Sequence, residues 1–289
     1  MINMVKSMKH FEFEKEEKYK LFRSVKEILH PSISKKNISD YKIVVNEDLA
    51  PIRIFYPKKV SSIQDVMIFI HGECKITNCK GKYSDISSRF SEEYNRLVIS
   101  IDYNDEVEVP EIISEVYDCF SYLYHELLNC GILKENIILM GDSTGGNILV
   151  NMITQMNQDN IGVGKMILFY PVLSGDYYGN PKYKSIEENC EIDHDLVKKL
   201  KTYYKKKHEK DSTIFPLLRS LENYYPDTLI IIGGVDPLID EAKDFSEKVE
   251  NCELSIIPFA NHGFLKTKDK EIQREIFDIL SRFIVENDH

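Results

Sequence analysis

Short runs of apolar residues recur along the chain and alternate with stretches that have helical spacing. Predominantly apolar runs, without a regular alternation of polar residues, are typical of strands that are buried on both faces of a parallel sheet. These runs lie at 66–70, 96–101, 136–140, 165–169, 228–232 and 254–258, and two shorter extended runs lie at 41–46 and 51–56. Helical spacing is clear at 111–128 and again at 150–156. The pattern predicts an α/β fold with a mostly parallel central sheet and helices on both faces.

Two parts of the chain depart from this alternation. Residues 11–29 are amphipathic and rich in Lys and Glu, which predicts a single helix. Residues 174–211 are rich in Tyr and charged residues, and they contain one helical pattern at 194–207. We therefore expect a catalytic core with two lid elements. The expected boundaries are 41–173 and 212–289 for the core, 1–40 for an N-terminal helical lid segment, and 174–211 for a lid insertion.

The net charge and the lack of long apolar segments bear on which partners the protein can bind. The 289 residues carry a formal net charge of −10, which argues against nucleic acid or an anionic membrane as the main partner. The first 20 residues are charged and lack the apolar segment of a signal peptide, and no run approaches the ~18 apolar residues of a membrane span. We expect a cytoplasmic protein without a membrane span, and a homodimer is compatible with the sequence.

The six cysteines follow no regular framework and include no C-x-x-C pair, so we expect reduced thiols. Cys74 and Cys79, with His71 nearby, are the one group that suggests zinc ligands. Their C-x4-C spacing is loose for a zinc site, and the sequence contains no second Cys or His pair that would complete four ligands. The sequence therefore predicts no metal and no organic cofactor.

The strongest local signal is the segment Gly141-Asp142-Ser143-Thr144-Gly145, which lies between an apolar run and a helical stretch. Small residues two positions on either side of a serine allow a strand to turn sharply into a helix, with the serine hydroxyl exposed at the turn. The motif alone fits an ordinary Gly/Ser turn equally well. Its position between strand and helix favours Ser143 as a nucleophile.

A serine hydroxyl needs a base to remove its proton and an acid to orient that base. His262 follows the last apolar run, and Asp236 directly follows the run at 228–232. Loops at the carboxyl ends of parallel strands converge, so we expect both residues near Ser143. The order Ser, Asp, His is that of the α/β-hydrolase fold. Three further acidic residues have helical spacing and predict a solvated helix face: Asp240, Glu241 and Asp244.

Several motifs resemble those of the hormone-sensitive-lipase-like esterases, in particular the bacterial acetyl-esterase branch. The segment GDSTGGN at Gly141–Asn147 is similar to the nucleophile motif of that family. Its D-P-L-x-D-E and H-G-F motifs are matched at 236–241 and 262–264. The resemblance extends from about residue 52 to the C-terminus and is weak in the two expected lid segments. It implies an α/β-hydrolase fold and hydrolysis of short-chain carboxylic esters through an acyl-enzyme on Ser143.

The sequence departs from that family where the oxyanion hole is expected. The family has His-Gly-Gly-Gly, whereas this chain has His71-Gly72-Glu73-Cys74. Glu and Cys take up some backbone conformations of glycine only with strain, and a carboxylate that points at a developing negative charge opposes catalysis. The expected backbone donors are Gly72, Glu73, Cys74 and Thr144. His71 is expected to support this loop. The altered segment leaves two outcomes open: a slow enzyme, or a loop of a different shape.

Two other functions remain compatible with these residues. An amidase, formamidase or peptidase could use the same three side chains, because preference for the leaving group depends on the pocket. A catalytically weak binding protein could retain the fold and the pocket. The complete set of Ser, Asp and His argues against this second alternative, and the altered oxyanion segment argues weakly for it.

Overall fold

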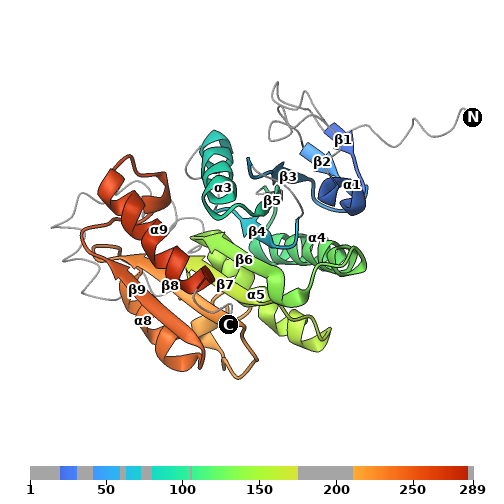
Figure 1. Ribbon diagram of the computed structural model, residues 1–289. Coiled ribbons are helices and arrows are strands. Elements are labelled where there is room, and N and C mark those ends of the chain that lie inside the picture. The colour runs from blue at the N-terminus through green and yellow to red at the C-terminus, as the bar shows by residue number, and fades with distance from the viewer. Residues whose placement is uncertain are drawn as a thin grey trace, which may run out of the picture.

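A single mixed sheet runs through the part of the chain that the structure describes (Figure 1). The computed structural model describes residues 20–30, 42–58, 63–72, 80–104, 106–174 and 211–285. Within them the strands follow the order β1-β2-β3-β5-β4-β6-β7-β8-β9 across the sheet. Their bounds are β1 Lys20–Phe22, β2 Lys42–Val44, β3 Ile52–Phe55, β4 Val66–Ile70, β5 Leu97–Ile101, β6 Ile137–Asp142, β7 Lys165–Phe169, β8 Asp227–Gly233 and β9 Cys252–Ile257.

The sheet is mostly parallel, as the sequence predicts. Strand β3 pairs antiparallel with both β2 and β5, and the other neighbouring strands pair parallel. Parallel neighbours need crossover connections, and most of these connections contain a helix that packs on the sheet. The carboxyl ends of β4, β6, β8 and β9 therefore meet at one edge, where the loops that follow them converge.

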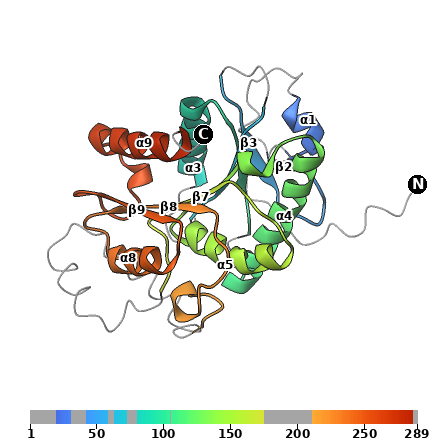
Figure 2. The same ribbon diagram turned by 60° about the horizontal axis from the view of Figure 1, so that its bottom comes forward.

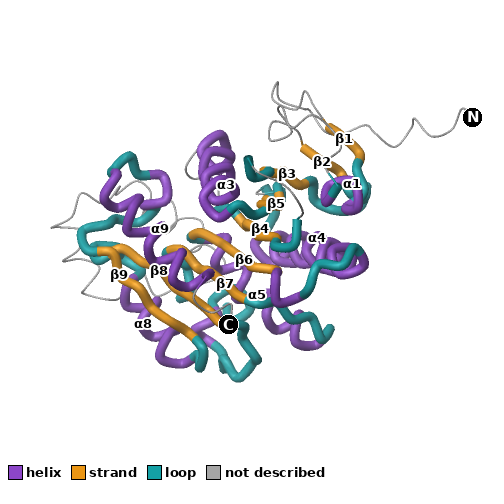
Figure 3. Tube along the Cα trace, viewed as in Figure 1, coloured by secondary structure: helices purple, strands orange, loops and turns teal. Residues whose placement is uncertain are grey.

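Helices cover both faces of the sheet (Figure 2). Helices α3 (Lys80–Tyr94) and α9 (Lys270–Val285) lie on one face. The other face carries α4 (Val109–Asn129), α5 (Thr144–Gln158) and α8 (Ile239–Lys248), and the short helix α1 (Val25–Leu29) packs against α4. Figure 3 shows the strands as a layer between these helices. The α/β-hydrolase fold expected from the sequence is confirmed.

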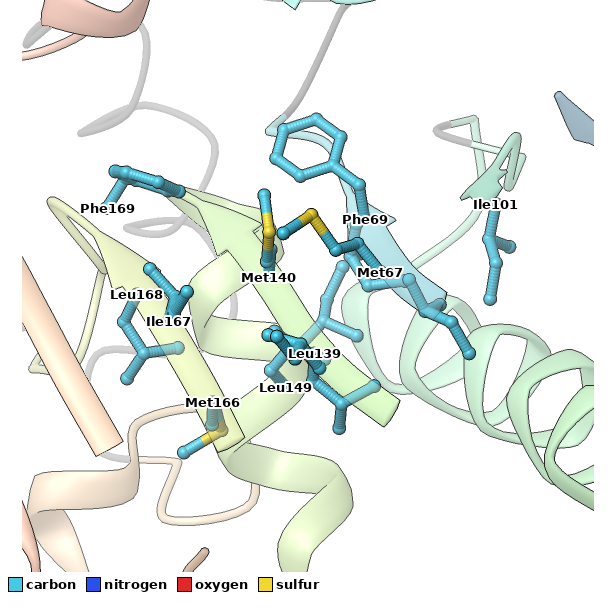
Figure 4. Close-up of a cluster of buried hydrophobic side chains, with 14 of the residues drawn as sticks. Met67, Phe69, Ile101, Leu139, Met140, Leu149, Met166, Ile167, Leu168 and Phe169 are labelled. Atoms are coloured by element: carbon cyan, nitrogen blue, oxygen red, sulfur yellow. The ribbon is translucent and has the colours of Figure 1, made fainter. Parts of the chain in front are cut away.

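The core is formed where the central strands meet these helices (Figure 4). All residues of β4, β6 and β7 are buried. The ring of Phe90 on α3 lies 6.2 Å from the ring of Phe69 and 5.8 Å from that of Phe169. Leu149 of α5 belongs to the same buried cluster. Full burial of each such side chain contributes about 1.5–3 kcal/mol, so this double-sided core holds the strand ends in place.

The N-terminal helix predicted over residues 11–29 is wrong at residues 20–24. Residues 20–22 form β1 and pair parallel with β2, and helix α1 begins at Val25. Ser24 caps this helix, because its Oγ accepts the N–H of Glu27 while the Glu27 carboxylate accepts the N–H of Ser24. The Ser-x-x-Glu capping box sets the helix start, and the segment before it gains its backbone hydrogen bonds from the sheet. The remainder, 11–19, lies outside the described residues, as does the helix expected at 194–207.

Three features of the described ranges bear on membranes, disulfides and metals. No helix in these ranges is both long and apolar enough to cross a bilayer. Their three cysteines are free thiols: Cys119, Cys130 and Cys252. Among the same residues, no group of three or more His, Cys, Asp or Glu side chains is placed to hold a metal ion. Cys74 and Cys79 lie outside the described residues.

Candidate active site

Ser143 lies at a sharp turn between β6, which ends at Asp142, and α5, which begins at Thr144. Its backbone angles are φ 53° and ψ −114°, a strained conformation for a residue other than glycine. The turn is closely packed: a Cβ on Gly145 would lie 2.0 Å from the carbonyl oxygen of Ile70. A larger residue at position 145 would therefore displace the backbone of the turn. The strand-to-helix turn predicted for Ser143 is confirmed.

The structure brings Ser143, His262 and Asp236 together in one hydrogen-bonded chain. The Oγ of Ser143 lies 3.1 Å from Nε2 of His262, and Nδ1 of His262 lies 3.0 Å from Oδ2 of Asp236. The side chain of Asp236 is fully buried, and its Oδ1 accepts the N–H of Leu238 at 2.8 Å. Asp236 is thus held rigidly on the side of the imidazole opposite the serine.

Backbone contacts hold the Asp236 loop and the His262 loop side by side. The N–H of Gly234 donates to the carbonyl of Ile257 at 2.8 Å, and the N–H of Val235 donates to that of Ala260 at 3.3 Å. The ring of Tyr170 meets the imidazole of His262 edge to face, with 4.8 Å between centroids. These contacts fix the position of the imidazole relative to Ser143.

Asp142, the residue before Ser143, is a buried acceptor with three donors. Its Oδ1 accepts the N–H of Gly72 at 2.6 Å, and its Oδ2 accepts the hydroxyls of Tyr83 at 2.9 Å and Tyr170 at 3.3 Å. Burial and the negative charge of Asp142 raise the pKa of Tyr170 well above its usual value, so this phenol stays neutral and donates. Asp142 thereby joins the strand end at Gly72 to the serine turn.

The expected oxyanion donors differ in what the structure shows of them. The N–H of Gly72 is directed to Asp142, so the prediction that it faces the oxyanion is not met in this conformation. Thr144 is buried as the first residue of α5, beside Ser143, where the helix presents the positive end of its dipole. Glu73 and Cys74 lie outside the described residues. Thr144 thus lies next to Ser143, and its role as an oxyanion donor stays a prediction.

His71 supports the segment that precedes these donors. Its ring stacks on Tyr103 with 4.5 Å between centroids and 15° between the ring planes. Its Nδ1 lies 2.8 Å from the carbonyl oxygen of Gly72, and the hydroxyl of Tyr103 donates to the carbonyl of His71 at 2.8 Å. These contacts agree with the supporting role expected for His71.

The prediction of a solvated face at the start of α8 is wrong for Glu241. Asp244 is exposed and pairs with Lys248 at 2.9 Å, but Glu241 is 4% exposed and accepts the N–H of Ser174 at 2.6 Å. Burial, reinforced by the negative charge of Asp236, raises the pKa of Glu241 to about 8. Helical spacing alone did not reveal that this face meets the chain that leaves β7.

We expect stability to depend on the protonation of Glu241. A folded-state pKa above the ordinary value of 4.5 means that the folded protein binds this proton more tightly than the unfolded chain. The stabilisation is present below pH ~4.5 and is lost as the pH rises to ~8, by up to ~1.4 kcal/mol for each pH unit. Urea unfolding at pH 5 and pH 9 measures this loss.

Glu241→Gln is the diagnostic substitution, because glutamine resembles the protonated acid in shape and cannot ionise. This variant should lose clearly less unfolding free energy than the native protein between pH 5 and pH 9. Glu247→Gln, at an exposed position on the same helix, should behave as the native protein does. Equal pH dependence of the native protein and Glu241→Gln would contradict the assignment.

Sequence reasoning gave no role at this site to Tyr83 or Tyr170, and it placed Glu241 on a solvated face. Tyr170 directly follows the apolar run of β7, and residues after such runs are the ones that reach the carboxyl edge of the sheet. That position could have marked it as a candidate. Tyr83 lies in the first turns of α3 and reaches Asp142 only through tertiary packing, so its place in the sequence carries no comparable signal.

Comparison with known proteins identifies the family. A protein family described by the alpha/beta hydrolase fold matches residues 67–266. A protein of Acanthamoeba polyphaga mimivirus, named for the same fold, is 25% identical over 229 residues, and the match spans 75% of this chain and 64% of that protein. An arylesterase of Saccharolobus solfataricus is 24% identical, with 87% of this chain and 84% of the relative covered. The solved structure of the Francisella virulence factor BioJ superposes with a TM-score of 0.69 at 21% identity, over 91% of this chain and 89% of that one.

Proposed function

The chain belongs to the α/β-hydrolase family, and from the geometry of its site we propose that it is a serine esterase acting on short-chain carboxylic esters. Ser143 is the nucleophile, His262 the general base, and Asp236 the acid that orients the base. The observation that carries the proposal is the hydrogen-bonded chain from Ser143 Oγ through the imidazole to Asp236, at 3.1 Å and 3.0 Å. The similarity to an arylesterase supports esters as the substrate class.

In the first half-reaction, His262 Nε2 takes the proton of Ser143 as Oγ attacks the ester carbonyl. The resulting imidazolium keeps its Nδ1 proton in the hydrogen bond to Asp236, whose negative charge stabilises it. The tetrahedral oxyanion then collapses and the C–O bond to the alcohol breaks. The alcohol leaves with the proton from Nε2, and the acyl group remains bonded to Oγ.

In the second half-reaction, a water molecule attacks the acyl-enzyme. His262 Nε2 takes one proton of the water, and the second tetrahedral oxyanion collapses with release of the carboxylic acid. The proton on Nε2 returns to Ser143 Oγ, so the site is restored without any other reactant. We assign the oxyanion contacts to the backbone N–H of Thr144 at the start of α5 and to those of Glu73 and Cys74.

Labelling with a fluorophosphonate probe tests the nucleophile directly, because such probes react with activated serines. We expect the native protein to be labelled at Ser143 and to hydrolyse p-nitrophenyl acetate. Faster cleavage of a matched anilide than of the ester would establish an amidase instead. A native protein that is neither labelled nor active on esters would be a binding protein on this fold, and the proposal would be wrong.

We expect the acyl chain of good substrates to contain two to about six carbons. Lipases that work at oil–water interfaces require a sizeable apolar surface. Few large apolar side chains are exposed among the described residues: Leu133, Leu218, Tyr224, Ile256 and Phe259. kcat/KM measured on p-nitrophenyl esters from acetate to decanoate should therefore fall at the long end of the series. Faster turnover of decanoate than of butyrate would refute this expectation.

We also propose that residues 174–211 form a lid beside the site. The described chain enters this segment at Ser174, whose N–H donates to the buried Glu241, five residues along the chain from Asp236. A cytoplasmic location is proposed as well, in agreement with the free thiols of Cys119, Cys130 and Cys252.

A further inference from the structure

We propose that Tyr83 and Lys266 are positioning residues that brace Gly72 against the nucleophile turn through Asp142. Tyr83 bonds to Asp142 and Lys266 bonds to Tyr83, so each acts on the catalytic groups through another residue. The inference rests on the proposed function, because its catalytic consequence is the placement of the oxyanion donors that follow Gly72. Its structural consequence can be measured without any substrate.

The hydroxyl of Tyr83 joins three parts of the chain that are distant in sequence. Tyr83, on α3, donates to Oδ2 of Asp142 at 2.9 Å and accepts a hydrogen bond from Nζ of Lys266 at 2.9 Å. Lys266 ends the 3₁₀ turn Phe264–Lys266, which begins two residues after His262. The hydroxyl therefore links the serine turn, helix α3 and the histidine loop through one atom.

Gly72 is packed directly against this link. A Cβ at Gly72 would lie 2.9 Å from the Tyr83 hydroxyl oxygen and 3.1 Å from Oδ2 of Asp142. Its N–H donates to the other carboxylate oxygen at 2.6 Å. Because Gly72 is held by Asp142 and Asp142 is held by Tyr83, loosening Tyr83 should loosen the start of the segment that carries Glu73 and Cys74.

Lys266 adds an electrostatic part to the brace. The carboxylate of Asp142 is 1% exposed and directly precedes the nucleophile. A buried carboxylate is costly without a compensating charge, and one close to a developing oxyanion opposes catalysis. The ammonium of Lys266 lies 4.3 Å from the centroid of the Tyr83 ring as well as against its hydroxyl, so its positive charge reaches Asp142 through a polarised O–H group.

The kinetic test compares Tyr83→Phe and Lys266→Met with the native protein on p-nitrophenyl acetate. We expect each variant to lower kcat by ~10-fold to 100-fold, about 1.4–2.7 kcal/mol of barrier, with KM changed less than twofold. The pH at which kcat/KM rises should stay unchanged, because the contacts of His262 are preserved. Lys266→Arg keeps the charge and the donors and should recover most of the activity.

The double variant separates a linked pair from two independent residues. If Lys266 acts through Tyr83, then Tyr83→Phe with Lys266→Met should lose little more activity than Tyr83→Phe alone. If the loss of kcat in the double variant equals the product of the two single losses, the linkage is contradicted. Tyr94→Phe on the same helix removes a hydroxyl bonded to the carbonyl of Phe277 at 3.1 Å, and Lys248→Met removes an exposed ammonium. Both matched controls should keep kcat within twofold.

Amide hydrogen exchange at Gly72, measured by NMR, tests the brace without catalysis. We expect exchange of the Gly72 N–H to become at least ~10-fold faster in Tyr83→Phe and in Lys266→Met, and to stay unchanged in Tyr94→Phe. An unchanged Gly72 rate in both variants, or kcat within twofold of the native value, would overturn the inference. If the native protein neither hydrolyses esters nor reacts with the fluorophosphonate, the proposed function fails, while the Gly72 exchange rates still decide whether the brace exists.

Discussion

Ser143→Ala is expected to lower kcat on p-nitrophenyl butyrate by at least ~10⁴-fold, the largest effect of any single substitution proposed for this protein. Alanine removes Oγ, the atom that lies 3.1 Å from His262 Nε2 and that would carry the acyl group. Without it, only binding and the oxyanion contacts remain to accelerate the reaction, and triads of this kind lose ~10⁴-fold to 10⁶-fold when the serine is removed. Initial rates and active-site labelling measure the loss.

The control for this substitution is Ser246→Ala, which removes a hydroxyl from α8 that donates to the carbonyl of Lys243. It should leave both the rate and the labelling unchanged. The Ser143→Ala variant should unfold at a urea concentration close to that of the native protein, since the change removes one small polar atom. Activity within tenfold of the native value, with labelling retained, would show that another residue is the nucleophile.

Asp236→Asn is expected to lower kcat by up to ~10⁴-fold while the shape of the site is preserved. The native carboxylate accepts the Nδ1 proton of His262 at 3.0 Å and leaves Nε2 free to take the serine proton. Asparagine can present an N–H at that position, which favours the tautomer with its proton on Nε2 and blocks the base. Steady-state rates over a range of pH values measure the effect.

Asp240→Asn is the matched control, because Asp240 lies four residues further along the chain, in the first turn of α8. It should change kcat by less than about threefold. Comparable losses from the two substitutions would mean that the wrong carboxylate has been assigned to the histidine. A large loss from Asp240→Asn alone would reverse the assignment.

Much of the framework could be predicted because burial on both faces leaves a continuous apolar run in the sequence. The runs at 66–70 and 165–169 coincide with β4 and β7 residue for residue, and the run at 228–232 lies inside β8. Such strands carry few polar residues, mostly at their ends, so their approximate bounds are visible without a structure. Ser143 and Asp236 follow strands of this kind, β6 and β8. His262 follows the edge strand β9, in which only Ile257 is buried, and its apolar run is visible in the sequence all the same.

The parts that could not be predicted depend on contacts between distant segments. Residues 20–22 belong to a stretch with an amphipathic helical pattern, 11–29, but pairing with β2 makes them a strand. Such tertiary pairing overrides a local preference. Glu241 has helical spacing with the exposed Asp244, yet it is buried and its carboxylate accepts a hydrogen bond from the chain that leaves β7. Tyr83 and Lys266 are 183 positions apart, and no periodicity connects them.

The tight packing around the serine turn has a consequence for how this protein can diversify. A Cβ on Gly145 would meet the carbonyl oxygen of Ile70 at 2.0 Å, and one on Gly233 would meet that of Ala260 at the same distance. Both atoms belong to the backbone, at the end of the central strand β4 and in the loop after the edge strand β9, so neither can yield as a flexible side chain would. Random mutagenesis at Gly145 and Gly233, followed by selection for active protein, should therefore recover almost exclusively codons for glycine. New substrate preferences, whether natural or engineered, have to arise at positions outside this rigid frame.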